Sequence, residues 1–94
     1  MEGYKESFIK DLNLNSPKIT ISGLIVSKEE NYLMIDDNTG IVQVEIENDL
    51  NVNDYARVFG ILMEFNGKKV LKGEIIQDLS KVNKKLYQKI RDLL

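Results

Sequence analysis

The chain has 94 residues, 43% of them hydrophobic, and a formal net charge of −2, which suits one domain with a single modest core. It contains neither cysteine nor histidine, so disulfides, cysteine nucleophiles, the usual zinc sites and histidine acid–base chemistry are excluded. No apolar run is long enough to cross a membrane, and the charged first ten residues do not resemble a signal peptide. We therefore expect no membrane partner and a protein inside the cell, cytoplasmic in a prokaryote or nuclear in a eukaryote.

The charge is distributed unevenly along the chain. Residues 17–78 carry six basic and eleven acidic side chains, a net charge of −5. Residues 79–94 carry five basic side chains and one acidic side chain, a net charge of +4. This difference divides the single domain into an acidic central part and a basic C-terminal segment.

Residues 1–16 form the first predicted element. Tyr4, Phe8, Ile9 and Leu12 follow the spacing of an amphipathic helix, which would end before Pro17. We expect this short helix to cap the open end of the core. A partner-binding peptide is the alternative.

The next two elements are a bent strand and a hairpin. Lys18–Ser27 alternates in one phase before Gly23 and in the other phase after it, which predicts a bulge or a sharp bend. Tyr32–Ile46 contains two alternating strands joined by a turn that ends in Gly40. The Asp and Asn residues of this turn tolerate left-handed conformations, and Gly40 accepts a positive φ at little cost. The residues predicted to face the core are Leu33, Ile35, Val42, Val44 and Ile46, whereas Met34, Gln43 and Glu45 are predicted to point away.

A second hairpin follows the polar loop of residues 47–54. The strand Tyr55–Phe65 is joined by Asn66-Gly67 to the strand Lys68–Ile76, and Asn-Gly between alternating strands predicts a two-residue type I′ turn. In that register Phe65 lies opposite Lys68, and the three preceding residues of the first strand lie opposite the three that follow Lys68.

Residues 79–94 are predicted to form a last helix, with Asp78 or Ser80 as its N-cap. One stripe of this helix is apolar, and it consists of Val82, Leu86, Ile90 and Leu93 or Leu94. The stripe has two possible roles, to pack on its own domain or to join an intermolecular bundle with other subunits or with a second copy of the chain. The basic face beside it would suit an acidic subunit or DNA.

The order of elements predicts the fold class. Residues 17–78 contain five short strands without alternating helices. Because the unpaired edge strands of an open sheet promote aggregation, a small chain of this kind favours a sheet closed into a five-stranded Greek-key barrel, the OB-fold. The expected architecture is thus all-β, with a short N-terminal helix at 1–16 and a C-terminal helix at 79–94.

No catalytic pattern is present, so we expect neither an enzyme nor a cofactor or metal site. Asp36 and Asp37 are adjacent, but Asp, Asn and Gly are the residues that turns use, and we assign them to the turn. The glycines are scattered singly, so no phosphate-binding loop is formed.

Single-stranded nucleic acid is the favoured ligand, because OB barrels bind it across their second and third strands and the neighbouring loops. Such binding needs aromatic rings for the bases and cations for the phosphates. The candidate residues are Phe65, Tyr32, Arg57, Lys68, Lys69 and Lys72. For the Phe65 ring, packing under a helix or loop is the alternative to stacking on a base, and a structural role is likewise the alternative for Tyr32. Because the barrel is acidic, we expect its binding to be weak to moderate and sensitive to salt.

Two motifs resemble the middle subunit of replication protein A. They are Ile35-Asp36-Asp37-Asn38-Thr39-Gly40 and the stretch from Val58 through Gly60, Leu62 and Phe65 to Lys68-Lys69, followed by the terminal helix. The resemblance implies an OB-fold subunit of a single-stranded-DNA-binding complex in replication, repair or recombination, with the terminal helix in a three-helix bundle between subunits.

The resemblance also assigns roles to single positions. Phe65 matches an aromatic residue that contacts DNA, whereas Glu45 stands where the family has a second stacking aromatic. An adaptor protein of a telomere or recombination complex resembles the same subunit. Two alternatives stay open, an OB domain that binds only proteins and a module that binds RNA or tRNA.

Overall fold

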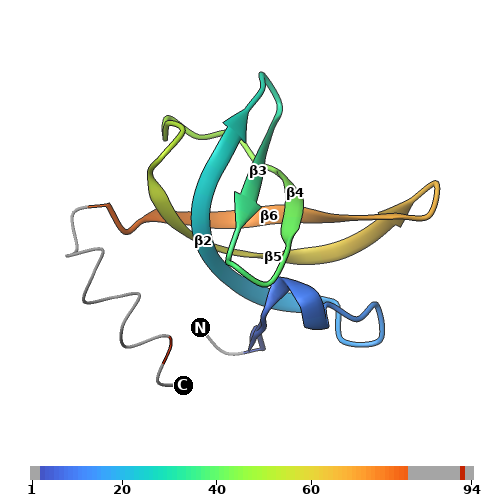
Figure 1. The fold of residues 1–94 in the computed structure, drawn as a ribbon. Helices are drawn as coiled ribbons and strands as arrows, with labels where there is room; N and C mark the ends of the chain where they lie inside the picture. The colour runs from blue at the N-terminus through green and yellow to red at the C-terminus, as the bar shows by residue number, and fades with distance from the viewer. Residues whose placement is uncertain (1–2, 81–91, 93–94) are drawn as a thin grey trace.

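The computed structural model of the protein describes residues 3–80 and 92. Its elements form one β-barrel (Figure 1). They are, in chain order, β1 (Lys5–Glu6), the 3₁₀ helix η1 (Ile9–Asp11), β2 (Lys18–Lys28), β3 (Tyr32–Asp36), β4 (Ile41–Glu45), β5 (Tyr55–Phe65) and β6 (Lys68–Asp78).

The barrel closes because β2 is shared by two neighbours. Residues Lys18–Leu24 of β2 pair with β5, and residues Leu24–Lys28 pair with β3, both antiparallel. The sheet then continues from β3 through β4 to β6, which joins β4 in parallel and β5 in antiparallel order. The five long strands therefore form the expected OB-like barrel. The short β1 adds a parallel pair to β2.

A close approach of two strands explains Gly23. A Cβ at this position would lie 2.5 Å from the carbonyl oxygen of Asp36 on β3, so only glycine lets the strands meet there. The irregularity in pairing lies later, between Ile25 and Ser27, and not at the glycine as predicted.

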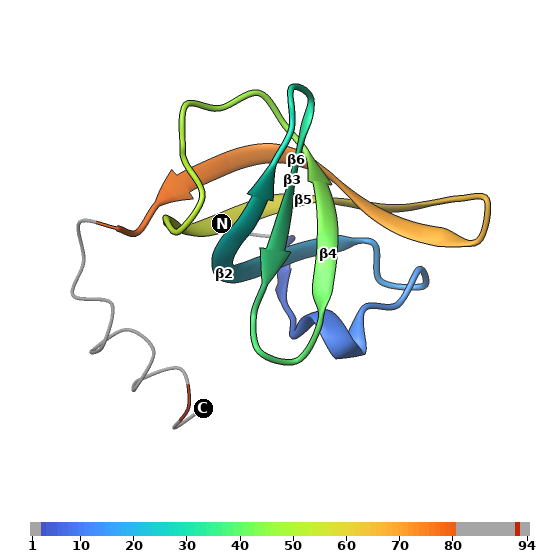
Figure 2. The ribbon, with the colours of Figure 1, turned by 45° about the horizontal axis from the view of Figure 1, so that its top comes forward.

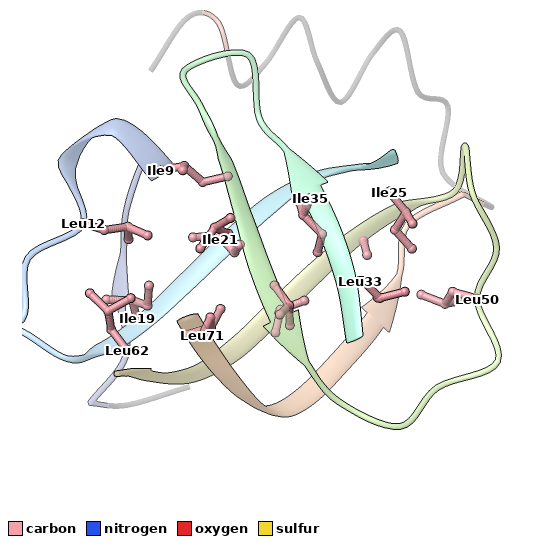
Figure 3. Packing of buried hydrophobic residues seen from close by; sticks show 14 residues of the cluster. Ile9, Leu12, Ile19, Ile21, Ile25, Leu33, Ile35, Leu50, Leu62 and Leu71 are labelled. Atoms are coloured by element: carbon pink, nitrogen blue, oxygen red, sulfur yellow. The ribbon is translucent and has the colours of Figure 1, made fainter. Parts of the chain in front are cut away.

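Alternating side chains fill the interior as the sequence predicts. Leu33, Ile35, Val42 and Val44 are buried, and Ile46 packs against the same cluster. Figure 3 shows Ile9 and Leu12 at one end of this core and Leu50, from the loop before β5, at the other end. The two ends of the barrel are thus closed by segments that lie outside its five long strands.

Both hairpin turns contain residues with positive φ, as their residue types allow. Asn66 and Gly67 both have positive φ, 53° and 80°, as a type I′ turn requires, and Phe65 lies opposite Lys68 as expected. In the β3–β4 turn, Asn38 and not Gly40 has the positive φ, at 73°. Gly40 instead makes room for η1, because a Cβ there would lie 3.1 Å from Cγ2 of Ile9.

The predicted N-terminal helix at 1–16 is wrong. Over its described residues the chain forms β1 and the single turn η1, because its backbone finds partners outside itself. The amide of Ser7 donates to the carbonyl of Thr20 on β2, and the amides of Ile9 and Lys10 donate to side chains of the β3–β4 turn. An isolated helix of this length is marginal in water, so these partners decide the conformation.

The expected fold class, a barrel flanked by two helices, is therefore corrected to a barrel without α-helices over residues 3–80. Leu79 and Ser80, where the C-terminal helix was expected to begin, are not helical. The amide of Leu79 extends the β5–β6 ladder, and Ser80 Oγ accepts from the amide of Tyr55. The rest of that prediction, on residues 81–91 and 93–94, lies outside the described residues. Within residues 3–80 and 92, no helix has the length and apolar character needed to span a membrane.

Candidate nucleic-acid interface

The outer face of β3, β4 and β6 carries side chains in parallel rows. Strand pairing places Met34 opposite Gln43 and Gln43 opposite Val70. The neighbouring row contains Tyr32, Glu45 and Lys72. The β5–β6 hairpin extends outward from the barrel past β4 (Figure 1).

Two apolar side chains are unusually exposed on this part of the barrel. Ile41 at the start of β4 is 56% exposed and Phe65 at the end of β5 is 52% exposed. They are the two most exposed large apolar side chains among the described residues. Exposed apolar groups that gather beside polar ones indicate a contact surface. Phe65 also lies opposite Lys68, so a ring and a cation stand together at the hairpin tip.

A hollow of ≈370 Å³ lies between the hairpin tip, β4 and η1. It is lined by Ile9, Leu12, Met34, Ile41, Val42, Gln43, Gly67, Lys68 and Lys69. Two hydrogen bonds hold the polar side chains of the hollow in position. Lys68 Nζ donates to Gln43 Oε1 at 3.2 Å, and Lys69 Nζ donates to the carbonyl of Leu12 at 2.8 Å. The N-terminal segment therefore supplies one wall of the hollow.

The β3–β4 turn fixes that wall. Asp37 is buried, with 4% of its surface exposed, and its Oδ2 accepts from the amide of Ile9 at 2.8 Å. Its Oδ1 accepts from the amide of Thr39 at 2.9 Å, and Thr39 Oγ1 in turn accepts from the amide of Lys10 at 3.1 Å. Figures 1 and 2 both show η1 beside this turn. The sequence prediction of a turn role for Asp36 and Asp37 is confirmed, and Asp37 has the additional role of holding η1.

The structure brings together some of the six predicted site residues and separates others. Phe65 and Lys68 are paired at the hairpin, and Tyr32 and Lys72 flank Glu45 in one row of the outer face. Lys69 lines the hollow.

Arg57 is the predicted residue that lies apart from the others. It is eight residues before Phe65 on the same strand, about 26 Å at the rise of an extended strand. Its Nε donates to Ser22 Oγ at 3.4 Å on the β2–β5 side of the barrel.

Three residues of the site were not selected from the sequence. Met34 and Gln43 were predicted to point outward but were given no role, and Ile41 was not singled out. The available signal was their alternation with the buried residues of the hairpin. What could not be seen was that the second hairpin stands next to them, since β4 and β6 pair across more than twenty residues of chain.

The charges around the face are mixed. Lys68, Lys69 and Lys72 lie near it, but the exposed Glu45 stands between Tyr32 and Lys72. Among the described residues, acidic side chains form no group of three or more that could hold a metal ion. The site thus offers rings, lysines and an apolar floor.

Sequence comparisons with family models and with curated proteins find no match. Solved structures do match. Telomere capping protein Ten1 from Saccharomyces pombe has a TM-score of 0.71 at 14% identity, over 96% of this chain and 95% of that one. The second OB-fold domain of replication protein A from Methanococcus maripaludis has a TM-score of 0.68 at 17% identity, over 85% of this chain and 100% of that one. A replication protein A heterotrimer bound to single-stranded DNA gives 0.63 at 18% identity, over 94% and 74%. These likenesses establish the OB-fold.

Proposed function

We propose that the protein is an OB-fold subunit that binds single-stranded DNA, in a complex like replication protein A or a telomere-capping complex. The observation that carries the proposal is the exposure of Phe65 and Ile41 on one face, bordered by a lysine-bearing hairpin. An apolar face with cations at its border offers stacking for bases and charge for phosphates.

The structural neighbours support the same class of function. One is named for telomere capping, and another was solved as a heterotrimer with single-stranded DNA bound. Their names describe binding and capping proteins, which agrees with an expectation of no enzymatic activity. The proposed place of action is inside the cell, in replication, repair or recombination of DNA.

The proposed contacts follow the outer face. A base stacks on Phe65, and phosphates are met by Lys68, Lys69 and Lys72. Tyr32 gives a second, half-buried ring farther along the face. Arg57 is left out of this set because its guanidinium lies on another side of the barrel.

Assembly is proposed to use the C-terminal segment 79–94. Val82, Leu86, Ile90 and Leu93 are its apolar positions, and they lie outside the described residues, so their role stays a prediction. The partners would be other OB-fold subunits or a second copy. The double variant Leu86→Asp with Ile90→Asp should reduce the assembled mass in light scattering, and an unchanged mass with unchanged partner capture would contradict this role.

The test of DNA binding is fluorescence anisotropy with an oligothymidine of ~30 nucleotides, which spans several OB-fold footprints. Phe65→Ala should weaken binding by about 5- to 150-fold, the equivalent of one lost base stack at roughly 1–3 kcal/mol. Ile75→Ala is the matched control, because it removes another exposed apolar side chain from the same hairpin but from its other end. That control should bind as the unmodified protein does.

Salt provides a second measurement. With three lysines contacting phosphates, the logarithm of the affinity should fall with the logarithm of the salt concentration with a slope of about −2, and Lys68→Gln should reduce the slope by about 0.7. No binding even at low salt would overturn the proposal and favour the alternative of a protein adaptor. Tighter binding of an RNA of the same sequence would favour an RNA module.

A further inference from the structure

The hollow beside the hairpin tip is an open depression in the outer face, bordered by three segments of the chain. The hairpin, β4 and η1 surround ≈370 Å³. Pockets for small ligands measure about 300–1,000 Å³, so this one is at the lower end and suits a single base rather than a stack of bases. The exposed ring of Phe65 lies at the neighbouring hairpin end.

The polar side chains that line the hollow are hydrogen-bond donors. Gln43 Oε1 accepts from Lys68 Nζ, and the Gln43 amide NH₂ can donate to a ligand. Lys69 Nζ uses one of its three protons on the carbonyl of Leu12 and keeps two. Among the described residues that line the hollow, none has an acidic side chain. The ammonium and amide protons of the lining favour a ligand that presents acceptors.

The apolar lining adds a second requirement. Ile9, Leu12, Met34 and Ile41 cover the remaining walls. Thymine meets both requirements, since its edge offers carbonyl oxygens and its C5 carries a methyl group. Cytosine and adenine place an exocyclic amine where thymine has O4, and that donor would face the donors of the hollow.

We propose that the hollow holds one thymine turned out of the stacked strand, and that the Gln43 amide discriminates it from cytosine by donating to O4, the oxygen that cytosine replaces with an amine. This inference rests on the proposed function, because it assumes that single-stranded DNA crosses the face. It adds a base preference that stacking on Phe65 does not supply, since every base has a face to stack.

The experiment compares oligomers of thymidine, deoxyuridine and deoxycytidine of equal length, in anisotropy titrations at one salt concentration. The unmodified protein should bind thymidine over cytidine by at least about five-fold, the value of one ordinary hydrogen bond. It should bind thymidine over uridine by about two- to four-fold, the value of one buried methyl group.

Gln43→Met keeps the length of the side chain but removes its donors. It should lower the thymidine-to-cytidine ratio several-fold, because thymidine loses a hydrogen bond and cytidine loses an unfavourable contact between two donors. Gln77→Met, an exposed glutamine at the other end of β6, is the matched control and should leave the ratio unchanged. Thermal melting would verify that both variants are folded, and the uridine comparison needs no variant at all.

The possible failures are distinguishable. If no oligomer binds, the proposed function fails and the base preference fails with it. If all oligomers bind but Gln43→Met leaves the thymidine-to-cytidine ratio at its original value, the DNA-binding proposal stands and the thymine pocket is refuted. An absence of any thymidine preference in the unmodified protein would also refute it.

Discussion

Replacing the carboxylate of Asp37 with an amide should detach the N-terminal wall from the barrel. In Asp37→Asn, the side chain keeps its size but one of its two oxygens becomes an NH₂ group. The oxygens of Asp37 now accept from the amide of Ile9 and from the amide and hydroxyl of Thr39. In either position the new NH₂ group would face an N–H or O–H donor. Since two donors form no hydrogen bond with each other, that donor would lose its acceptor.

The magnitude follows from the burial of this group. A hydrogen bond to a charged partner contributes about 1.5–3 kcal/mol, and a buried amide left without a partner costs about 1–3 kcal/mol. Asp37 is almost fully buried, so we expect a loss of about 2–3 kcal/mol in the free energy of unfolding. For a domain of this size that loss corresponds to a fall of roughly 10–20 °C in Tm.

Urea denaturation followed by circular dichroism would measure this loss. Asp36→Asn is the matched control one residue away, because Asp36 is half-buried and its Oδ1 accepts only a local bond from the amide of Asn38 at 2.7 Å. The control should cost less than about 1 kcal/mol. Equal losses in the two variants would refute the view that Asp37 holds η1 in place.

Three further predictions concern other parts of the molecule. Gly23→Ala should destabilise the fold by about 3 kcal/mol or more, since its Cβ would lie 2.5 Å from a backbone oxygen of β3, whereas Gly67→Ala meets open space and should cost only about 1–2 kcal/mol for its positive φ. The hydrogen bond that Tyr4 donates to a carboxylate on β6 raises the pKa of the phenol above 10.0, so its contribution to stability should be constant below that pH and disappear as the pH rises through the raised value. Denaturation of Tyr4→Phe across the alkaline range checks this, because the variant should lack that pH dependence. Glu45→Gln should tighten oligothymidine binding by about two- to five-fold at low salt and not at high salt, while Asp49→Asn, in the loop before β5, should not change it.

The barrel was predictable because local signals agree with each other. Buried and exposed residues alternate in β3 and β4, and Asn66 and Gly67 have the positive φ values of a type I′ turn. Both features depend only on residues that are close together in the sequence. The same alternation correctly placed Gln43 and Glu45 on the outer face, and the register of the second hairpin put Phe65 beside Lys68.

The N-terminal segment was not predictable in the same way. Its apolar spacing fits a helix, and Ile9 and Leu12 are indeed buried. However, their burial is achieved by one 3₁₀ turn, whose amides are satisfied by Asp37 and Thr39 from the far end of β3. Hydrogen bonds to partners nearly thirty residues away produce no periodic pattern in the sequence. The helical spacing of the apolar residues was therefore the only pattern on which a prediction could rest.

The same long-range contact explains why the hollow could not be predicted from the sequence. Asp37 and Thr39 have the residue types that turns prefer, and a local account of the turn is complete without η1. Yet their oxygens position the wall that carries Ile9 and Leu12, and Leu12 in turn engages Lys69 of the hairpin. The turn, the N-terminal wall and the hairpin tip are therefore one connected unit, and a change in the turn should alter the shape of the proposed base pocket as well as the stability of the barrel.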